Sequence, residues 1–173
     1  KSSLYCYGKV ISFDMDVLKD IFDSEFTIDF WAKSNNSGCI FGMRWESATQ
    51  GSGANNYSGI AFSCKDIYIG NGSWTHVTIP DVIYNEWVHY AIVRKETTVY
   101  LYVNGTMVQS FNYSNNPFFS GIRYLLTFGN FSKLNTGGYE YDGYVDEFRI
   151  SDVARWTTDF TPPVRAYSSP TVY

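Results

Sequence analysis

The most regular alternation of hydrophobic and polar residues in the chain lies between Trp87 and Asn112. Trp87–Lys95 is rich in β-branched and aromatic residues and contains no Gly or Pro, a composition typical of a strand. Val99–Val103 alternates aliphatic residues with tyrosines, and Met107–Phe111 follows the pair Asn104-Gly105. Because a type I′ turn needs two residues at positive φ, Asn-Gly between two such runs indicates a hairpin. The pattern predicts a three-stranded antiparallel meander with one face packed on another layer.

Short alternating runs separated by turn signals fill most of the remaining chain. In FTIDFWAK, Phe26 and Phe30 share one face while Asp29 and Lys33 take the other. Helical spacing is confined to 14–24, with one further capped helical turn expected at 151–155. A second Asn-Gly pair at Asn71-Gly72 predicts another hairpin. About eleven or twelve short strands without alternating helices predict an all-β sandwich or barrel. Outside the meander, strands are expected at residues 4–13, 26–33, 39–45, 59–63, 65–70, 74–79, 124–128 and 139–150.

Composition and charge narrow the class of protein. A chain of 173 residues is expected to form one domain, and an aromatic content of 19% suits wide sheets and binding surfaces. The net charge is −4 and the basic residues are scattered, which excludes a basic stripe for nucleic acid. No run approaches the ~20 apolar residues of a membrane span, and Lys1 begins no signal-peptide pattern. We therefore expect neither nucleic-acid partners nor membrane insertion.

Three cysteines, Cys6, Cys39 and Cys64, lie in apolar runs and lack the spacing of a zinc site. They are expected to be small buried hydrophobic residues. One disulfide remains open as an alternative in an oxidising compartment.

Several blocks of the sequence resemble one known superfamily. WVHYAIVRK with TVYLYVNGTMV, FTIDFWAK and GYVDEFRISDVARWTTDFTPP are similar to the concanavalin A-like sandwiches. More narrowly, they resemble the laminin G-like jelly-roll modules of phage tail and other virion proteins and of bacterial surface proteins. The resemblance runs from about Leu4 to Pro163 and implies an all-β jelly-roll sandwich of two antiparallel sheets with one or two short helical turns. The expected division is a sandwich over residues 1–163 and an extended C-terminal tail over 164–173.

The same resemblance implies a place on a virion or an extracellular cell surface. Members of the superfamily bind glycans, bind proteins, hydrolyse glucans or act as spacers, so the fold does not fix the function. One departure is at Tyr7-Gly8-Lys9, where such modules often carry Phe-Asp-Gly; this puts an N-terminal metal ligand in doubt.

Acidic and histidine residues offer little for catalysis. Retaining glycosidases need two carboxyl groups about 5–5.5 Å apart, and the related glucanases place them in a Glu-x-Asp-x-x-Glu strand that this chain lacks. Glu140 and Asp142 share a face, but a glycine follows at once. His76 and His89 have no nucleophile elbow to serve, and His89 is expected to be a hydrogen-bonded core residue. We expect no enzyme, with a glycan hydrolase using Glu140 as a remote alternative.

Asp146 is a candidate metal ligand. Alternation from Tyr144 to Ile150 places it on the more apolar face, with Glu147 and Arg149 forming a surface ion pair on the other. A buried carboxylate needs backbone N–H donors, a cation or a metal. Related modules hold calcium near this end of the sheets, and calcium takes six to eight oxygen ligands. A structural hydrogen-bonding role and a calcium site both remain open.

Aromatic residues beside amide-rich loops are candidates for sugar binding. A ring stacks on the apolar face of a sugar while amides bond its hydroxyl groups. The expected sites are rim loops near residues 46–58, 70–75 and 129–140; the alternative is that the rings pack the bases of these loops. Trp31, Trp87 and Trp156 are instead expected to pack on the sheets. The candidate ligand-binding residues are Trp45, Asn56, Tyr57, Asn71, Trp74 and Asn135.

The leading hypothesis is a non-catalytic adhesion module that recognises cell-surface glycans through these loops. The alternative is a structural virion domain that contacts other virion or surface protein chains and has no sugar site. The Pro-bearing segment from Thr161 motivates this alternative, and an oligomer within a larger assembly is compatible with it.

Overall fold

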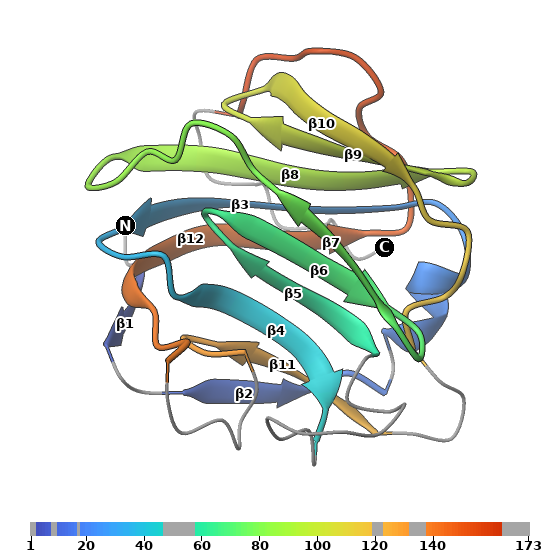
Figure 1. Ribbon diagram of the computed structural model, residues 1–173, viewed down its shortest axis with the longest axis horizontal. Coiled ribbons are helices and arrows are strands. Elements are labelled where there is room, and N and C mark those ends of the chain that lie inside the picture. Colours follow the sequence, from blue (N-terminus) through green and yellow to red (C-terminus); the bar gives the residue numbers. More distant parts are fainter. Residues whose placement is uncertain are drawn as a thin grey trace, which may run out of the picture.

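The computed structural model describes residues 3–7, 10–16, 18–46, 58–118, 123–131 and 138–163. Two six-stranded antiparallel sheets pack face to face, as the sequence predicts (Figure 1). The first sheet has the order β1 (Leu4–Tyr7), β12 (Asp142–Ser151), β3 (Phe26–Ser34), β8 (Trp87–Lys95), β9 (Thr98–Val103), β10 (Thr106–Asn112). The second has the order β2 (Ile11–Asp14), β11 (Tyr124–Phe128), β4 (Cys39–Trp45), β5 (Gly59–Ser63), β6 (Asp66–Gly70), β7 (Trp74–Thr78).

One short helix accompanies the sheets in the described part of the chain. It is the 3-10 helix η1 (Lys19–Asp23), inside the region where the sequence shows helical spacing. The guanidinium of Arg94 donates to the carbonyls of Phe22 and Asp23 at 3.1 and 3.0 Å and so binds the helix end to β8. None of the described helical structure is long and apolar enough to cross a membrane.

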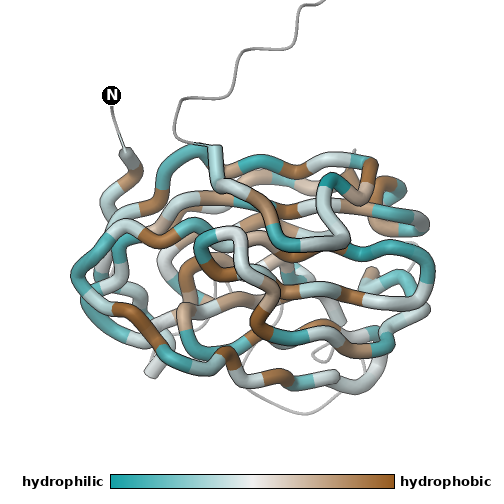
Figure 2. The backbone as a smooth tube through the Cα atoms, turned by 90° about the horizontal axis from the view of Figure 1, so that it is seen from above, coloured by the Kyte–Doolittle hydropathy of each residue, from teal (hydrophilic) through white to brown (hydrophobic). Residues whose placement is uncertain are grey.

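The core lies between the two sheets and is built largely from aromatic rings. The Phe30 ring of β3 lies 5.4–5.6 Å from the rings of Phe41, Phe62, Tyr90 and Phe148. Successive side chains of a strand point to opposite faces, so the hydrophobic positions alternate with polar ones along the strands (Figure 2). Each such ring pair contributes about 0.5–1.5 kcal/mol beyond the area it buries.

The central meander is confirmed as β8, β9 and β10. Asn104 and Gly105 both have positive φ, 50° and 81°, and the flanking residues pair directly, as a type I′ turn requires. The second Asn-Gly hairpin also forms, but with a different turn. Gly70 pairs with Trp74, which leaves three turn residues, and Gly72 has φ 87°. The hairpin expected at Asn71-Gly72 is therefore confirmed, with three residues in its turn.

The opening run of residues 4–13 is two strands and not the single strand expected. β1 pairs with β12 in the first sheet, whereas β2 pairs with β11 in the second. Cys6 of the first sheet is buried in the core. In the second sheet, the Phe13 ring of β2 meets the Phe128 ring of the neighbouring β11 at 6.3 Å. The chain thus crosses between the sheets at their shared edge.

A β-bulge in β12 places Asp146 on a different face from the one expected. The ladder with β3 shifts register between Asp146 and Arg149, and Glu147 has φ 54°. Because the bulge adds a residue to one strand, Phe148 turns into the core while Asp146 stays on the outer face beside Trp31. Asp146 Oδ1 accepts the Glu147 N–H at 2.9 Å, which is one of the two roles considered for it.

The segment that follows β12, residues 152–163, lies across the outer face of the first sheet; we call it the strap (Figure 1, red). Thr27 Oγ1 donates to the Val153 carbonyl at 2.7 Å and accepts the Arg155 N–H at 3.0 Å. The Trp31 indole donates to the carbonyl of Pro163 at 3.1 Å. The helical turn expected at 151–155 is wrong, because β3 supplies partners to backbone groups that a helix would pair internally.

A second, smaller core lies beneath the strap. The Trp156 and Phe160 rings stack at 3.9 Å, and Phe160 packs on Tyr102 and His89 at 5.2 and 5.8 Å. His89 is fully buried as expected, but its Nε2 lies 3.5 Å from Asp29 Oδ2, outside hydrogen-bond geometry. The strap therefore buries part of the outer face of this sheet.

Arg149 pairs with Asp29 across this second core. Its Nε and NH2 donate to the two carboxylate oxygens of Asp29, both at 2.9 Å. Asp29 is fully buried, whereas the Arg149 side chain is 22% exposed. Arg149 thus makes a bidentate, partly buried ion pair with Asp29, a partner that the alternation along β12 did not predict.

Candidate functional site

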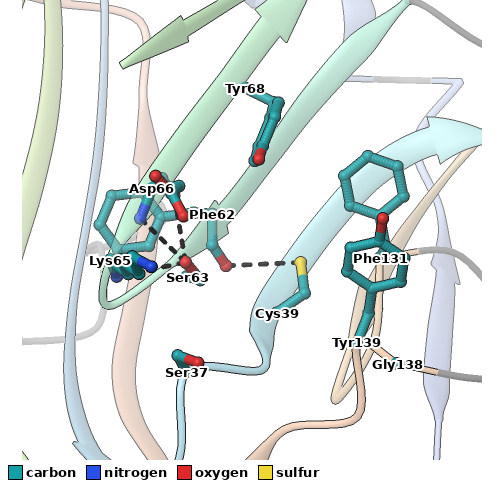
Figure 3. A pocket seen from close by; sticks show the side chains of 10 residues that line it. All are labelled: Ser37, Cys39, Phe62, Ser63, Lys65, Asp66, Tyr68, Phe131, Gly138 and Tyr139. Atoms are coloured by element: carbon teal, nitrogen blue, oxygen red, sulfur yellow. Dashed lines mark hydrogen bonds between the residues drawn. The ribbon is translucent and has the colours of Figure 1, made fainter. Parts of the chain in front are cut away.

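A pocket of about 170 Å³ opens on the outer face of the second sheet. The β5–β6 hairpin forms one wall, the turn before β4 forms another, and the chain before β12 forms the third (Figure 3). In Figure 3 the Phe131 and Tyr139 rings stand opposite the hairpin, and the Cys39 thiol lies between these rings and the hairpin. The lining residues are Ser37, Cys39, Phe62, Ser63, Lys65, Asp66, Tyr68, Phe131, Gly138 and Tyr139.

Hydrogen bonds fix the polar wall of the pocket. Ser63 Oγ accepts the N–H groups of Lys65 and Asp66 at 3.2 and 2.9 Å, which sets the tight turn between β5 and β6. Asp66 Oδ1 lies 2.8 Å from His76 Nε2 and accepts the Thr78 hydroxyl at 3.1 Å. The carboxylate is thereby held at the rim by two residues of β7.

Tyr68 supplies the first aromatic ring and stands between the polar wall and the loop. Its ring stacks on His76 at 4.4 Å with an interplanar angle of 1° and meets Phe131 edge-on at 6.0 Å. Burial, and then the negative charge of Asp66, raise the pKa of the Tyr68 phenol. The hydroxyl therefore stays protonated at neutral pH and can donate a hydrogen bond to a ligand.

The second and third rings come from the chain that precedes β12. Phe131 and Tyr139 stack at 5.3 Å, and the Cys39 N–H donates to the Tyr139 carbonyl at 2.9 Å. The Phe131 carbonyl lies directly over Gly42 of β4, where any side chain would collide with it. Gly42 thus lets this segment rest on the sheet and bring its rings to the pocket.

The turn before β4 is fastened to the same segment. Asn36 Nδ2 donates to the Glu140 carbonyl at 2.9 Å, and Asn36 Oδ1 accepts the N–H groups of Gly38 and Asp142 at 3.0 and 3.1 Å. Glu140 Oε2 accepts the Gly138 N–H at 3.0 Å. The carboxylate on which the hydrolase alternative depends therefore takes part in shaping this loop.

Arg44 supports the aromatic wall from the sheet below. Its guanidinium carbon lies 4.1 Å from the centroid of the Phe131 ring and 4.7 Å from that of Trp74. Arg44 is almost fully buried, and this burial lowers its pKa to about 10. The side chain is still charged at neutral pH and makes cation–π contacts with both rings.

Cys39 at the pocket floor is a structural thiol. It donates to the carbonyls of Phe41 and Phe62 at 3.0 and 3.4 Å, and burial raises its pKa to about 12. A nucleophilic cysteine needs a lowered pKa, so this thiol is inert. Cys6 and Cys64 are also buried and free, which confirms the expectation of small buried residues and not the disulfide alternative.

The candidate binding residues are distributed over several places. Trp74 belongs to the cluster beside the pocket, 6.1 Å from Phe131, whereas Trp45 packs against the main core. Asn71 Nδ2 donates to the Asn116 carbonyl at 2.6 Å and braces its turn. Asn56, Tyr57 and Asn135 lie outside the described residues, as does the tail 164–173.

The pocket lining includes Phe131, Gly138 and Tyr139 of the rim loop expected at 129–140, but none of the residues named individually as sugar-binding candidates. A signal existed in the alternation of β6 and β7. It places Asp66 and Tyr68 on the same face of the sheet as their cross-strand partners, Thr78 and His76. The contribution of Phe131 and Tyr139 had no comparable local signal, because it depends on where their segment crosses β4.

Asp146 Oδ1 accepts the Glu147 N–H in the hydrogen bond given above. Among the described residues, no group of three or more His, Cys, Asp or Glu side chains could hold a metal ion. Backbone carbonyls also bind calcium, so a calcium site at Asp146 stays a prediction.

Two six-stranded antiparallel sheets with a pocket on an outer face define a concanavalin A-like β-sandwich. The family model described as the Concanavalin A-like lectin/glucanases superfamily matches residues 10–159, and the chain belongs to this family. No curated protein sequence matches the chain.

Solved structures share the fold at low sequence identity. The K499G mutant of the NanB sialidase from Streptococcus pneumoniae superposes with a TM-score of 0.68 and 20% identity over 91% of this chain. The match spans 26% of that sialidase, so the chain corresponds to about a quarter of its length.

Two further neighbours are isolated modules with bound sugars. The CBM40 of the Ruminococcus gnavus IT-sialidase, bound to α2,3-sialyllactose, matches with a TM-score of 0.63 and 13% identity over 91% of this chain and 92% of that one. Domain 4 of AbnA, an extracellular GH43 arabinanase from Geobacillus stearothermophilus, in complex with arabinotriose, matches with 0.61 and 19% over 88% and 71%.

Proposed function

We propose that this chain is a non-catalytic glycan-binding module that holds one terminal sugar unit in the pocket of the second sheet. The observation that carries the proposal is the position of three aromatic rings around one pocket: the Tyr68 ring stands beside the polar Ser63–Asp66 wall, and the Phe131 and Tyr139 rings face that wall. Aromatic rings stack on the apolar face of a sugar, while fixed polar groups bond its hydroxyls.

Pocket size favours a single sugar unit over a chain. The volume of about 170 Å³ is smaller than the roughly 300–1,000 Å³ of pockets that enclose drug-sized ligands. Lys65 and the Tyr68 hydroxyl can donate to sugar oxygens, and Asp66 can accept from a hydroxyl. One cation beside one carboxylate gives this rim little net charge, which suits a neutral or singly charged sugar.

The structural neighbours supply two probes of different charge. Sialyllactose is anionic and arabinotriose is neutral, and each is bound by a module with this fold. Titration calorimetry with both, followed by a glycan array, tests the proposal. We expect Tyr68→Ala to weaken binding at least about tenfold, since the loss of a stacked ring costs about 1.5 kcal/mol.

Phe13→Ala is the matched control, because it removes an exposed ring from the same sheet outside the pocket. It should leave the affinity unchanged. A chain that binds no glycan on the array, or a Tyr68→Ala variant that binds as well as the parent, would overturn the proposal.

The setting we propose is a virion, as part of a tail fibre or decoration, or a cell surface, with a cell-surface glycan as partner. The support is the resemblance of the sequence to modules of virion and bacterial surface proteins. Immunogold labelling of intact virions or cells with an antibody against this chain checks it, and label confined to the cell interior would contradict it.

A further inference from the structure

The outer face of the first sheet carries a second, separate group of exposed aromatic residues. We call Tyr5, Tyr7, Tyr144 and Trp87 the aromatic platform; their exposed fractions are 51%, 67%, 36% and 42%. Trp87, which was expected to pack on the sheet, lies beside Tyr144 on the sheet face and still has an exposed surface. Exposed apolar surface gathered in one place commonly marks a binding site.

Strand register makes the platform continuous. Tyr5 of β1 pairs with Tyr144 of β12, Tyr144 pairs with Lys33 of β3, and Lys33 pairs with Trp87 of β8. Directly paired residues point to the same face, so one row of side chains crosses the four strands: Tyr5, Tyr144, Lys33 and Trp87. With strands about 4.7–4.9 Å apart, the row extends roughly 14 Å.

The rings support one another. Tyr5 and Tyr144 lie 4.7 Å apart, Tyr144 and Trp87 6.3 Å apart, and Tyr5 and Tyr7 are parallel within 5° at 6.4 Å. The Tyr5 hydroxyl donates to Asp142 Oδ1 at 3.4 Å. The platform is therefore ordered before any ligand arrives, which lowers the entropy cost of binding.

Coverage by the strap does not extend to the platform. The strap buries the neighbouring part of the same sheet face, where Trp156 and Phe160 pack over His89. Its described part ends at Pro163, bonded to the Trp31 indole. One half of the outer face is thus closed by the chain itself, while the aromatic half is exposed.

We propose that the aromatic platform binds an extended segment of a neutral glycan chain, with successive sugar units stacked on successive rings. This goes beyond the proposed function, because it concerns the other sheet and a chain instead of a terminal unit. The ligand chemistry follows from the row itself: flat rings for the sugar faces, with a lysine between them and the Asp142 carboxylate beside them for the hydroxyls.

Charge argues against the other macromolecules that use aromatic stacking. Single-stranded nucleic acid needs a positively charged groove, whereas Lys33 is the one cation of the row and the chain has a net charge of −4. Protein interfaces are depleted of lysine and aspartate at their centres, yet Lys33 lies within this row and Asp142 at its edge. A polyhydroxylated chain can use both.

Affinity electrophoresis tests the proposal with arabinan, mixed-linkage β-glucan, xylan and galactomannan as probes. We expect at least one polysaccharide to retard the parent chain. Trp87→Ala and Tyr144→Ala should each raise the dissociation constant at least about tenfold, whereas Tyr144→Phe, which keeps the ring, should stay close to the parent. Phe13→Ala, an exposed ring outside the platform, should not change it.

The outcomes separate this proposal from the pocket. A parent chain retarded by none of the four polysaccharides, or platform variants that are retarded like the parent, would overturn it. Retardation abolished by Tyr68→Ala but not by Trp87→Ala would keep the proposed function and reject the platform. Sedimentation is the second readout: if Trp87→Ala converts a dimer to a monomer, the face is a contact between copies and the glycan proposal is wrong. Melting temperatures near that of the parent verify that the variants fold.

Discussion

Removal of the Arg149 side chain should destabilise the protein, because the buried carboxylate of Asp29 loses its bidentate cation. Asp29 is fully buried and receives two charge-assisted bonds from Arg149, both at 2.9 Å. Loss of one partner of a buried pair costs about 3–5 kcal/mol, because a buried charge is left uncompensated. Arg149 is 22% exposed and His89 lies 3.5 Å away, so water and imidazole relieve part of this cost. We expect Arg149→Met to lower the free energy of unfolding by about 3 kcal/mol.

Urea unfolding followed by tryptophan fluorescence measures this loss. Arg155→Met is the matched control, since that guanidinium donates to the neutral Ser151 hydroxyl at 2.8 Å, and its loss should cost less than about 1 kcal/mol. The double variant Asp29→Asn with Arg149→Met should recover part of the stability, because it removes the buried charge as well. A loss in Arg149→Met no larger than in Arg155→Met, or a double variant less stable than Arg149→Met, would refute the reasoning.

Three further outcomes are expected. Stability should fall as pH rises from about 9 toward 12. Burial raises the pKa of Cys39 and of Tyr113 to about 12 in the fold, whereas in the unfolded chain these groups have pKa values of about 9 and 10 and lose their protons first. Equal urea midpoints at about pH 8 and pH 11 would contradict this. Gly105→Ala should cost about 3 kcal/mol, because φ is 81° and a carbonyl of the strap occupies the position of the new side chain. Gly138→Ala, at φ 83° in open space, should cost about 1 kcal/mol. Thermal melts compare the two variants, and equal losses would count against the close approach at Gly105. If Asp146 binds calcium, calcium should raise the melting temperature of the parent but not of Asp146→Asn, and identical melts in calcium and chelator would exclude the site.

Local pattern was enough to predict most of the strands. Cys39–Trp45, Gly59–Ser63 and Tyr124–Phe128 have the bounds expected, and each run has a Gly or Ser residue directly at one of its ends: Gly38, Ser58 and Gly129. The meander followed from its alternation and from one Asn-Gly pair. These features depend on residues a few positions apart, which a single sequence displays directly.

Features that depend on distant residues could not be predicted in this way. Thr27 bonds to Val153 across 126 positions, and nothing near either residue indicates it. The bulge at Glu147 changed the face of Asp146 without interrupting the hydrophobic pattern. The pocket needed a glycine in β4 to admit Phe131, a close approach that becomes visible once the sheet is assembled.

The strap also sets an order of events during synthesis. Thr27, Asp29 and Trp31 are made more than a hundred residues before the groups that cover or pair with them. Until Arg149 and the strap have left the ribosome, the carboxylate of Asp29 and the indole of Trp31 face water, and β3 has an uncovered outer surface. Contacts so distant in sequence close slowly, because the intervening chain must be ordered first. The strap thus completes the outer surface of a strand made more than a hundred residues before it, and a nascent chain stalled before Arg149 should remain exposed to chaperones and proteases.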